Sequence, residues 1–484
     1  MTLLSRLYGV RPALRDRVQV RRNVEIPAAD GVRLLATPYD PAGRRRPPLV
    51  LLRSPYGRGN AVDQLPKLLA ERGYQVLYQS LRGTAGSGGR FDGFVIDPAD
   101  ANGTLSWLRA RPWFGGELAT WGAGYLGFVQ WELAARDIPQ WKVALIQDAP
   151  SAFDEGFMYP GGAFATGNAL GRVQLVERML LGGYGVARQM AGMVGAARRL
   201  SRATLTLPLE EADRALTGYP VPWFRGWTRH GPGEPYWANT DHRVNVARMP
   251  PVVHLQGGWH DFFLPGMLDV ALLGRQAPSG VRLFVTGAGR WNDVSAWPPA
   301  HKPVPWFLRP GGGLGPTPHE GPSAPSRYRY GPADPPPTVA GTQMGLSAGA
   351  KDNRAIEARA DVLTFTTAPL AEDVEAVGPV RVMLHARSGN PHASWPMAHR
   401  FLRGHRVRVQ VSSGAHPRFG RTPAPVSRSR PGRTCAPRSM RSSTTTTTRQ
   451  PSGCPSLQEH REATRSRRHP PRGPRHRRGR VGAR

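Results

Sequence analysis

Apolar and polar residues follow two different patterns between residues 24 and 148. Short runs that are apolar throughout are typical of strands covered on both faces, and apolar residues every three to four positions are typical of helices. The pattern predicts a hairpin at 24–34, strands at 48–53, 74–78, 118–121 and 142–147, and helices at 64–72 and 100–110. Strands that alternate with helices indicate an α/β fold with a parallel sheet and helices on both faces.

The stretch from 152 to 246 is richer in glycine, methionine and arginine. Helical periodicity recurs at 173–181 and 187–200, so we expect a mostly helical insertion that caps a site. The sheet is expected to resume with a strand at 251–255. Residues 24–151 and 247–310 are therefore predicted to be the two halves of one α/β domain.

After residue 310 the pattern changes to proline-rich turns and short strands, at 361–365, 380–384 and 407–411. This pattern is typical of an all-β domain, and we predict a sandwich or jelly roll for residues 311–420. Residues 421–484 have no periodicity and are dominated by Arg, Pro, Ser and Thr. That composition predicts a disordered tail.

The chain has 484 residues, which is long enough for two or three domains. It has no apolar stretch of membrane-spanning length, and its first residues lack the apolar core of a secretory signal. We therefore expect a cytoplasmic protein without a membrane association. Both cysteines, Cys435 and Cys454, fall in the tail, so the body is expected to have neither disulfides nor a cysteine metal site.

A net charge of +31 suggests nucleic-acid binding, but its distribution argues against that function. Residues 421–484 carry 17 Arg, no Lys and 2 acidic residues, so about half of the excess charge lies in the tail. Arg outnumbers Lys 61 to 4 over the whole chain, which is typical of GC-rich coding. We therefore do not expect nucleic acid to be a partner.

The most informative run is Gly122-Ala123-Gly124-Tyr125-Leu126-Gly127, directly after the strand predicted at 118–121. Its glycines fit a nucleophile elbow, a strained strand-to-helix turn that presents a serine hydroxyl at the edge of an α/β sheet. The serine position is Gly124, which has no side chain. The alternative is a plain glycine-rich turn that binds an anion at a helix N-terminus.

Four runs in this order resemble the cocaine esterase-type (CocE/NonD) serine hydrolases, relatives of the X-prolyl dipeptidyl-peptidases. They are Arg53-Ser54-Pro55-Tyr56-Gly57-Arg58, Arg82-Gly83 with Gly86-Ser87-Gly88-Gly89, Trp113 to Gly127, and Gly257-Gly258-Trp259-His260-Asp261. The resemblance covers residues 24–420. It implies an α/β-hydrolase domain with a helical cap insertion and a C-terminal jelly roll, here truncated.

The resemblance also implies roles for single residues. Gly124 occupies the nucleophile position and Asp261 the position of the triad acid. The hydroxyl of Tyr56 and the backbone N–H of Tyr125 are the implied donors of the oxyanion hole. Such acyl transfer uses neither a metal nor an organic cofactor, and the implied substrates are small esters or amides, with X-prolyl dipeptides among them.

Aromatic residues surround the candidate triad acid. We take Trp259 and Phe262 as candidate substrate-binding residues, although the same side chains could simply fill the core. The sequence does not decide between these two roles, and it does not give the oligomeric state.

The chain departs from the family pattern at several places. Gly124 replaces the serine. The run that carries the family's triad histidine is missing near 279–281, and the next histidine, His301, lies in a proline-rich loop. A second junction at 390–399 lacks expected strands, and the resemblance stops after Arg421. We interpret these departures as the product of a damaged gene, with one substitution, two internal losses and a frameshift.

Three functions remain in competition. The first is a CocE/NonD-type hydrolase by ancestry that is inactive or severely impaired. The second is a non-catalytic pseudoenzyme that keeps the pocket and binds a carboxylate or ester ligand. The third is a basic tail that binds nucleic acid or anionic surfaces.

Overall fold

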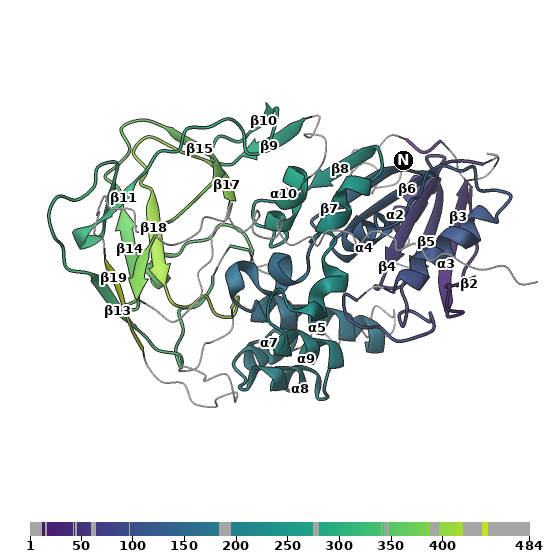
Figure 1. Cartoon of the computed structure of the whole chain (residues 1–484), viewed down its shortest axis with the longest axis horizontal. Helices are drawn as coiled ribbons and strands as arrows, with labels where there is room; N and C mark the ends of the chain where they lie inside the picture. Colours follow the sequence, from purple (N-terminus) through teal and green to yellow (C-terminus); the bar gives the residue numbers. More distant parts are fainter. Residues whose placement is uncertain are drawn as a thin grey trace, which may run out of the picture. The chain divides into compact units, whose positions relative to one another are not determined.

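The computed structural model describes residues 12–14, 17–41, 43, 46–59, 64–95, 97–182, 195–273, 280–339, 341–342, 344, 348–387, 396–419 and 438–443. One large sheet organises the chain up to residue 256, and several smaller sheets follow it (Figure 1).

The large sheet has the strand order β1-β3-β5-β4-β6-β7-β8, with β2 paired to β3. Its strands are β1 (Val18–Val20), β2 (Val24–Pro27), β3 (Arg33–Pro41), β4 (Leu49–Ser54), β5 (Gln75–Ser80), β6 (Leu118–Ala123), β7 (Trp141–Gln147) and β8 (Val252–Gln256). β3 is antiparallel to its neighbours, and the strands from β5 to β8 run parallel to one another. This arrangement confirms the predicted α/β fold and its edge hairpin.

The central strands are buried on both faces, as their continuous apolar runs predicted. In β4, Leu49 and Leu51 belong to one hydrophobic core and Val50 and Leu52 to another. Successive side chains of a strand point to opposite faces, so each face of the sheet has its own core. The helices that cover these faces are α2 (Gln64–Ala70), α3 (Pro98–Arg109) and α4 (Tyr125–Leu133).

Between β7 and β8 the chain forms the expected helical insertion (Figure 1). Its main helices are α5 (Thr166–Gly182), α7 (Ala196–Thr204), α8 (Ala212–Thr217) and α9 (Pro222–Arg229), with shorter turns at η2 (Asp154–Met158), η3 (Pro160–Gly162), η4 (Leu209–Glu211), η5 (Pro235–Thr240) and η6 (Arg243–Arg248). The helix predicted at 173–181 is the second half of α5. Residues 187–194 of the other predicted helix lie outside the described residues, and its end belongs to α7.

The last strand of the large sheet, β8, has a paired neighbour on one side only within the described chain. Val252 and Val253 are 55% and 37% exposed, whereas every residue of β4 and β5 is buried. Helix α10 (Leu264–Leu273) follows β8, and the next strand along, β9 (Val281–Val285), pairs with β10 (Arg290–Val294) instead of β8. The described sheet therefore ends at β8, shortly before the junction near 279–281 where the run with the family's histidine is missing.

The C-terminal part consists mainly of short β-strands, in agreement with the predicted β domain. Its sheets are β11-β12-β14-β18, β13-β19-β16 and β15-β17. The elements are β11 (Phe307–Arg309), η7 (Pro310–Gly312), β12 (Gly313–Gly315), β13 (Ser326–Tyr330), α11 (Arg354–Glu357), β14 (Val362–Thr366), β15 (Val374–Pro379), β16 (His385–Arg387), β17 (Pro396–Phe401), β18 (Arg408–Ser412) and β19 (Arg438–Ser443). The predicted strands at 361–365 and 407–411 are β14 and β18, which pair with each other.

Two predictions for this part do not hold. Residues 380–384 form no strand, because no described strand pairs with them, and Val382 and Met383 are 49% and 85% exposed. Within the tail, β19 pairs with β13 and β16. The prediction of disorder is therefore wrong for the six residues of this strand. The rest of 421–484, with both cysteines, lies outside the described residues.

Candidate active site

The turn between β6 and α4 has the geometry of a nucleophile elbow. Gly124 is the one residue between them, with φ 57° and ψ −117°. Its N–H donates to the backbone oxygen of Gln147 at 2.9 Å, which fixes the turn to the end of β7. A residue in this backbone region is strained unless it is glycine.

The three glycines of the elbow have different steric reasons to be glycine. A Cβ on Gly122 would lie 2.2 Å from the Cβ of Leu126, and a Cβ on Gly127 would lie 2.6 Å from the Cβ of Ala149. Those two positions have no room for a side chain. A Cβ on Gly124 would find nothing closer than a backbone oxygen at 4.0 Å, so space for a side chain exists at the position where the serine is expected.

The candidate triad acid lies at the same edge of the sheet, in the loop after β8. One carboxylate oxygen of Asp261 accepts a hydrogen bond from the backbone N–H of Phe263 at 2.6 Å. Burial raises the pKa of Asp261 to about 6, and the nearby charge of Asp148 adds to this rise. A triad acid that orients a histidine has a positive or hydrogen-bonding partner. In the described chain Asp261 forms no ion pair with a histidine, and no histidine is among the groups that shift its pKa.

Asp148 was missed in the sequence and lies between the elbow and the candidate triad acid. It directly follows β7, has φ 42°, and accepts a hydrogen bond from the backbone N–H of Gly258 at 3.1 Å. Burial raises the pKa of its carboxyl group. An acidic residue at the carboxyl end of a predicted parallel strand was a signal that could have identified it.

The two tyrosines of the implied oxyanion hole lie together. Their rings meet edge to face, with centroids 6.4 Å apart. Tyr125 is the first residue of α4, where backbone N–H groups have no acceptor within the helix, and its hydroxyl donates to the backbone oxygen of Gly93 at 2.5 Å. The hydroxyl of Tyr56 accepts a hydrogen bond from Nη1 of Arg172 at 2.5 Å.

Arg172 is a second site residue that was missed in the sequence. It comes from α5 of the helical insertion and is only 4% exposed. It shares the buried face of this helix with Ala169, Val173 and Val176. A single arginine at helical spacing among apolar residues was the available signal.

The two candidate substrate-binding aromatics point in different directions. Phe262 packs against Phe157 of the insertion, with ring centroids 5.3 Å apart. Trp259 donates from its indole N–H to the backbone oxygen of Phe284 at 2.8 Å, and its ring lies 5.8 Å from that of Trp297. Phe262 therefore adjoins the aromatic cluster near Arg172, whereas these Trp259 contacts are made with Phe284 of β9 and with Trp297. Their role in substrate binding stays a prediction.

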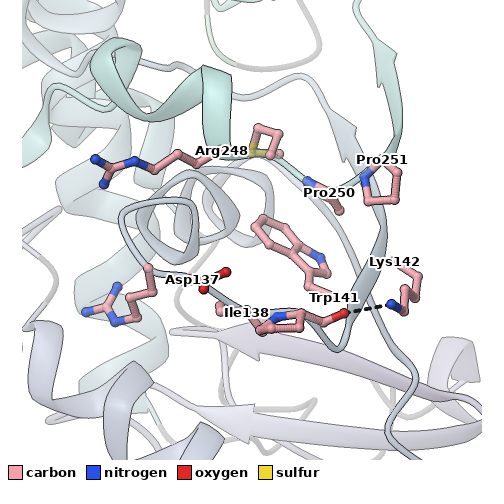
Figure 2. Close-up of a pocket in the computed structure, with 10 residues that line it drawn as sticks. Asp137, Ile138, Trp141, Lys142, Arg248, Pro250 and Pro251 are labelled. Atoms are coloured by element: carbon pink, nitrogen blue, oxygen red, sulfur yellow. Dashed lines mark hydrogen bonds between the residues drawn. The ribbon is translucent and has the colours of Figure 1, made fainter.

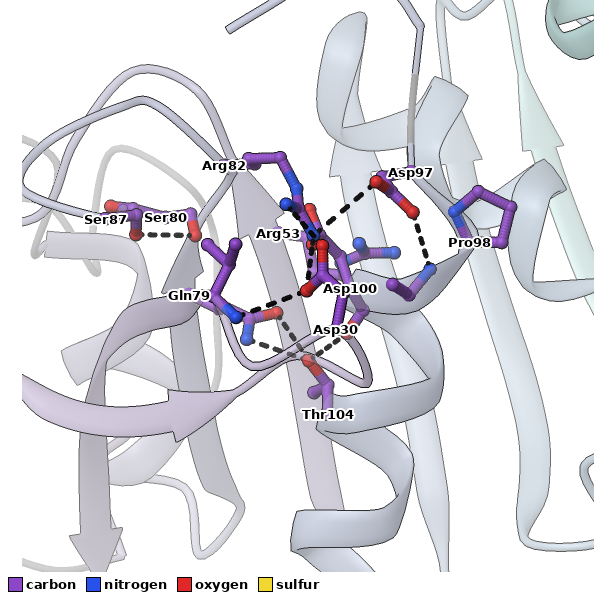
Figure 3. A network of polar contacts seen from close by, with 12 residues as sticks. Asp30, Arg53, Gln79, Ser80, Arg82, Ser87, Asp97, Pro98, Asp100 and Thr104 are labelled. Atoms are coloured by element: carbon purple, nitrogen blue, oxygen red, sulfur yellow. Dashed lines mark hydrogen bonds and ion pairs between the residues drawn. The ribbon is translucent and has the colours of Figure 1, made fainter. Parts of the chain in front are cut away.

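Two arginines of the runs that carry the family resemblance support the loops around the site. Arg53 forms a buried ion pair with Glu132 of α4 at 3.0 Å. Arg82 binds Asp100 at 2.6 Å and Asp30 at 2.8 Å, which holds the glycine-rich loop after β5 against α3 and the edge hairpin (Figure 3). This loop carries Gly93, the acceptor of the Tyr125 hydroxyl.

A cavity of about 480 Å³ lies at the opposite end of the sheet (Figure 2). Its lining residues are Arg136, Asp137, Ile138, Pro139, Trp141, Lys142, Arg248, Met249, Pro250 and Pro251. The start of β7 and the residues before β8 line this cavity. It therefore lies at the amino ends of these strands, whereas the elbow and Asp261 follow the carboxyl ends of the strands of this sheet. This cavity is separate from the candidate site.

The arrangement has parts of an acyl-transfer site and lacks others. The candidate oxyanion donors and the candidate triad acid lie near the elbow, but Gly124 offers no nucleophilic atom. His301 lies exposed, with its ring hydrogen-bonded to the backbone oxygen of Pro299. Among the described residues, no group of three or more His, Cys, Asp or Glu side chains gathers as in a metal site. No helix in the described ranges is long and apolar enough to cross a bilayer.

Comparison with known families gives two matches that overlap at residues 274–286. Residues 30–286 match the family described as X-Pro dipeptidyl-peptidase (S15 family), and residues 274–395 match the X-Pro dipeptidyl-peptidase C-terminal non-catalytic domain. The chain is also 27% identical over 451 residues to the cocaine esterase of Rhodococcus sp. (strain MB1 Bresler), covering 76% of this chain and 78% of that protein. The aligned length exceeds the covered part of this chain, so the relative has stretches without a counterpart here.

Solved structures show the same fold at low sequence identity. An α-amino acid ester hydrolase matches with a TM-score of 0.68 at 20% identity, over 90% of this chain and 96% of that one. An aminopeptidase from a marine sediment Thaumarchaeota archaeon matches with a TM-score of 0.67 at 19% identity, over 88% and 94%. A CocE/NonD family hydrolase from Staphylococcus aureus matches with a TM-score of 0.55 at 12% identity, over 88% and 92%.

Proposed function

Because the chain belongs to the X-Pro dipeptidyl-peptidase (S15) family, we propose that it is a CocE/NonD-type hydrolase whose catalytic step is severely impaired. Its ancestral reaction is hydrolysis of small acyl esters or amides, X-prolyl dipeptides included, through an acyl-enzyme. The observation that carries the proposal is Gly124, which occupies an elbow with room for a side chain but supplies no hydroxyl.

The proposal follows from what each step of acyl transfer needs. Attack on the acyl carbon needs an oxygen nucleophile and a base to take its proton, and neither is present at the elbow among the described residues. Asp261 lacks the histidine that it would orient. Loss of the nucleophile alone lowers turnover about 10⁶-fold in a well-studied serine protease, and further losses from the same triad add little. The remaining oxyanion donors can still bind an acyl group.

The connectivity of the chain supports the inference that the catalytic base is absent. Only residues 274–279 separate α10 from the segment that continues into β9, and this is too short for a strand, a histidine-bearing loop and a helix. The exposed edge of β8 lies where that strand would pair. Both features agree with an internal loss near residue 280.

Labelling with a fluorophosphonate probe tests this function directly. We expect no covalent labelling of the purified full chain and no release of p-nitrophenol from p-nitrophenyl acetate above a heat-treated control. An X-prolyl p-nitroanilide should also stay intact. Stoichiometric labelling, or turnover that the probe abolishes, would contradict the proposal because both need an activated nucleophile.

A second candidate function is ligand binding without turnover. The contact between Tyr56 and Arg172 favours it, because these side chains keep hydrogen-bond donors beside an elbow that no longer reacts. The expected result is a rise in unfolding temperature with an ester or carboxylate ligand in the absence of hydrolysis. Binding of nucleic acid by the tail, and a cytoplasmic location, stay predictions.

A further inference from the structure

Arg172 is a buried cation with unused hydrogen-bonding capacity. Its side chain donates to the hydroxyl of Tyr56 through Nη1, and its Nε has no hydrogen-bond partner. A guanidinium group carries several N–H donors arranged as a planar fork. One neutral acceptor therefore leaves most of this capacity unsatisfied in a residue that is only 4% exposed.

The described surroundings of Arg172 offer aromatic rings and no ion pair. Its guanidinium carbon lies 5.4 Å from the ring centre of Phe94 and 5.8 Å from that of Phe157. In the described chain it forms no ion pair with a carboxylate, in contrast to the buried Arg53, which pairs with Glu132. The carboxyl group of Asp261 feels its charge, which partly offsets the rise in the pKa of Asp261 caused by burial, without a direct ion pair. Aromatic faces compensate a buried charge only in part, so an anion beside Arg172 would be strongly favoured.

Arg172 lies beside the groups that would hold an acyl ligand. Its hydrogen-bond partner, Tyr56, is the implied oxyanion donor, and the Tyr56 ring contacts Tyr125 next to Gly124. Phe157, which faces the guanidinium, also packs against Phe262 beside Asp261. Arg172 thus lies next to the candidate acyl site, and Tyr56 and Phe157 contact both.

We propose that Arg172 binds a carboxylate carried by the acyl group, so that the site selects esters and amides of dicarboxylic acids. This inference rests on the proposed function, because it places the acyl group between the elbow and Tyr56. A planar carboxylate matches the guanidinium fork and would receive charge-assisted hydrogen bonds from it. The Nε–H that lacks a partner would gain one.

The test compares two ligands that differ at one end, where one has an ionised carboxylate and the other has its neutral methyl ester. Monomethyl glutarate carries one ionised carboxylate at pH 7.5, and dimethyl glutarate replaces it with a neutral methyl ester. Binding of each to the full chain is measured by calorimetry at equal ionic strength, with methanol release followed in parallel. We expect the wild type to bind the monoester about ten- to a hundredfold more tightly, the range for hydrogen bonds to a charged group.

Two variants assign that preference to Arg172. Arg172→Met should lose the preference, which is measured as the ratio of the affinities for the two esters within that variant. Arg198→Met, at an exposed arginine of α7, should keep the preference and controls for general loss of positive charge. If Arg172→Met does not fold, Arg172→Lys serves instead and should keep only part of the preference, since an ammonium lacks the planar fork.

The outcomes separate the inference from the function on which it rests. Equal binding of both esters by the wild type would overturn the carboxylate role and leave an acyl site in place. A preference that survives in Arg172→Met would also overturn it, as would the absence of binding by either ester. Methanol release would contradict the proposed impairment, and the ratio of the two hydrolysis rates would then measure the same selectivity.

Discussion

A Cβ placed on Gly124 meets nothing closer than the backbone oxygen of Asp148, at 4.0 Å. The glycines two residues before and three residues after it are tightly enclosed, so the open space is specific to the nucleophile position. The elbow has thus kept the shape that a serine requires although the hydroxyl is absent. What the site lacks is reactive atoms rather than room for them.

Gly124→Ser should fold but should not restore esterase activity. The side chain fits, yet φ 57° is unfavourable for serine and should lower the free energy of unfolding by about 1–2 kcal/mol. Without a histidine next to Asp261, the new hydroxyl stays protonated and weakly nucleophilic. Thermal unfolding and p-nitrophenyl acetate hydrolysis measure the two effects. A rise in turnover of about 10³-fold or more would reveal a base outside the described residues.

Alanine at the two flanking glycines should be far more damaging than alanine at Gly124. Gly122→Ala and Gly127→Ala place a methyl group within 2.2 and 2.6 Å of other carbon atoms, so the helix α4 must move away from the sheet. We expect losses of about 2 kcal/mol or more, against about 1 kcal/mol for Gly124→Ala. Denaturant unfolding of the three variants gives the order. Equal losses at all three positions would mean that the elbow is more adaptable than its packing indicates.

Asp261→Asn should stabilise the protein at neutral pH and not at acidic pH. Burial raises the pKa of Asp261 from its ordinary 3.8 to about 6, so the folded state holds the proton more tightly than the unfolded chain does. Stability then falls as pH rises from about 4 to 6 and stays lower above that range. Asparagine cannot ionise and keeps the acceptor for the N–H of Phe263.

The measurement for Asp261→Asn is the unfolding temperature against pH. We expect the variant to unfold about 2 °C or more above wild type at pH 7.5, and at the same temperature near pH 4. A variant that is less stable at pH 7.5 would indicate that the ionised Asp261 has a cationic partner.

Glu132→Leu should be strongly destabilising on its own. It leaves Arg53, with a side chain only 1% exposed, without its counter-charge, and such a break costs about 3–5 kcal/mol. Burial raises the pKa of Glu132, which means that its ion pairs only partly offset the loss of hydration. The double variant Arg53→Met with Glu132→Leu should therefore recover most of the loss. Urea unfolding of both variants checks this, and an additive loss in the double variant would show that Arg53 has a second essential partner.

Resequencing of the coding DNA tests the damaged-gene hypothesis. We expect another reading frame after codon 421 to encode further β-strand patterns, and the junctions near codons 280 and 394 to lack coding sequence that relatives have. The hypothesis of a frameshift is contradicted if the DNA confirms the present reading frame and no other frame encodes β-strand patterns. The protein would then be a decayed hydrolase, and ligand binding would be the function left to test.

The main sheet and the elbow could be predicted from the sequence because each depends on the residue types within a short segment. The run 48–53 is apolar up to Arg53, and a strand covered on both faces buries all of its apolar side chains. The elbow was recognisable because glycine spacing reports backbone geometry directly. The strand predicted at 380–384 was wrong because alternation specifies a strand only when a neighbour supplies hydrogen bonds, and none pairs with it in the described chain.

The site residues that the sequence missed depend on contacts between distant elements. Arg172 lies 116 positions from Tyr56 along the chain, and only the folded insertion brings the two together. The roles of Asp148 and of the Arg53–Glu132 pair likewise depend on which strands and helices become neighbours. Composition could not give these contacts, although an arginine on an apolar helix face was a visible anomaly.

The backbone angles at Gly124 also bear on the evolutionary history of this site. In an active enzyme of this fold, selection for activity keeps a strained serine in the turn against its cost in stability. Once activity no longer matters, glycine relieves that strain and is favoured by folding alone. Under the proposed function, reversion to serine lowers stability without an immediate gain in activity, because no base lies at the elbow among the described residues. The substitution thus acts as a ratchet, and descendants of such a gene are expected to drift further from catalysis while they keep the fold.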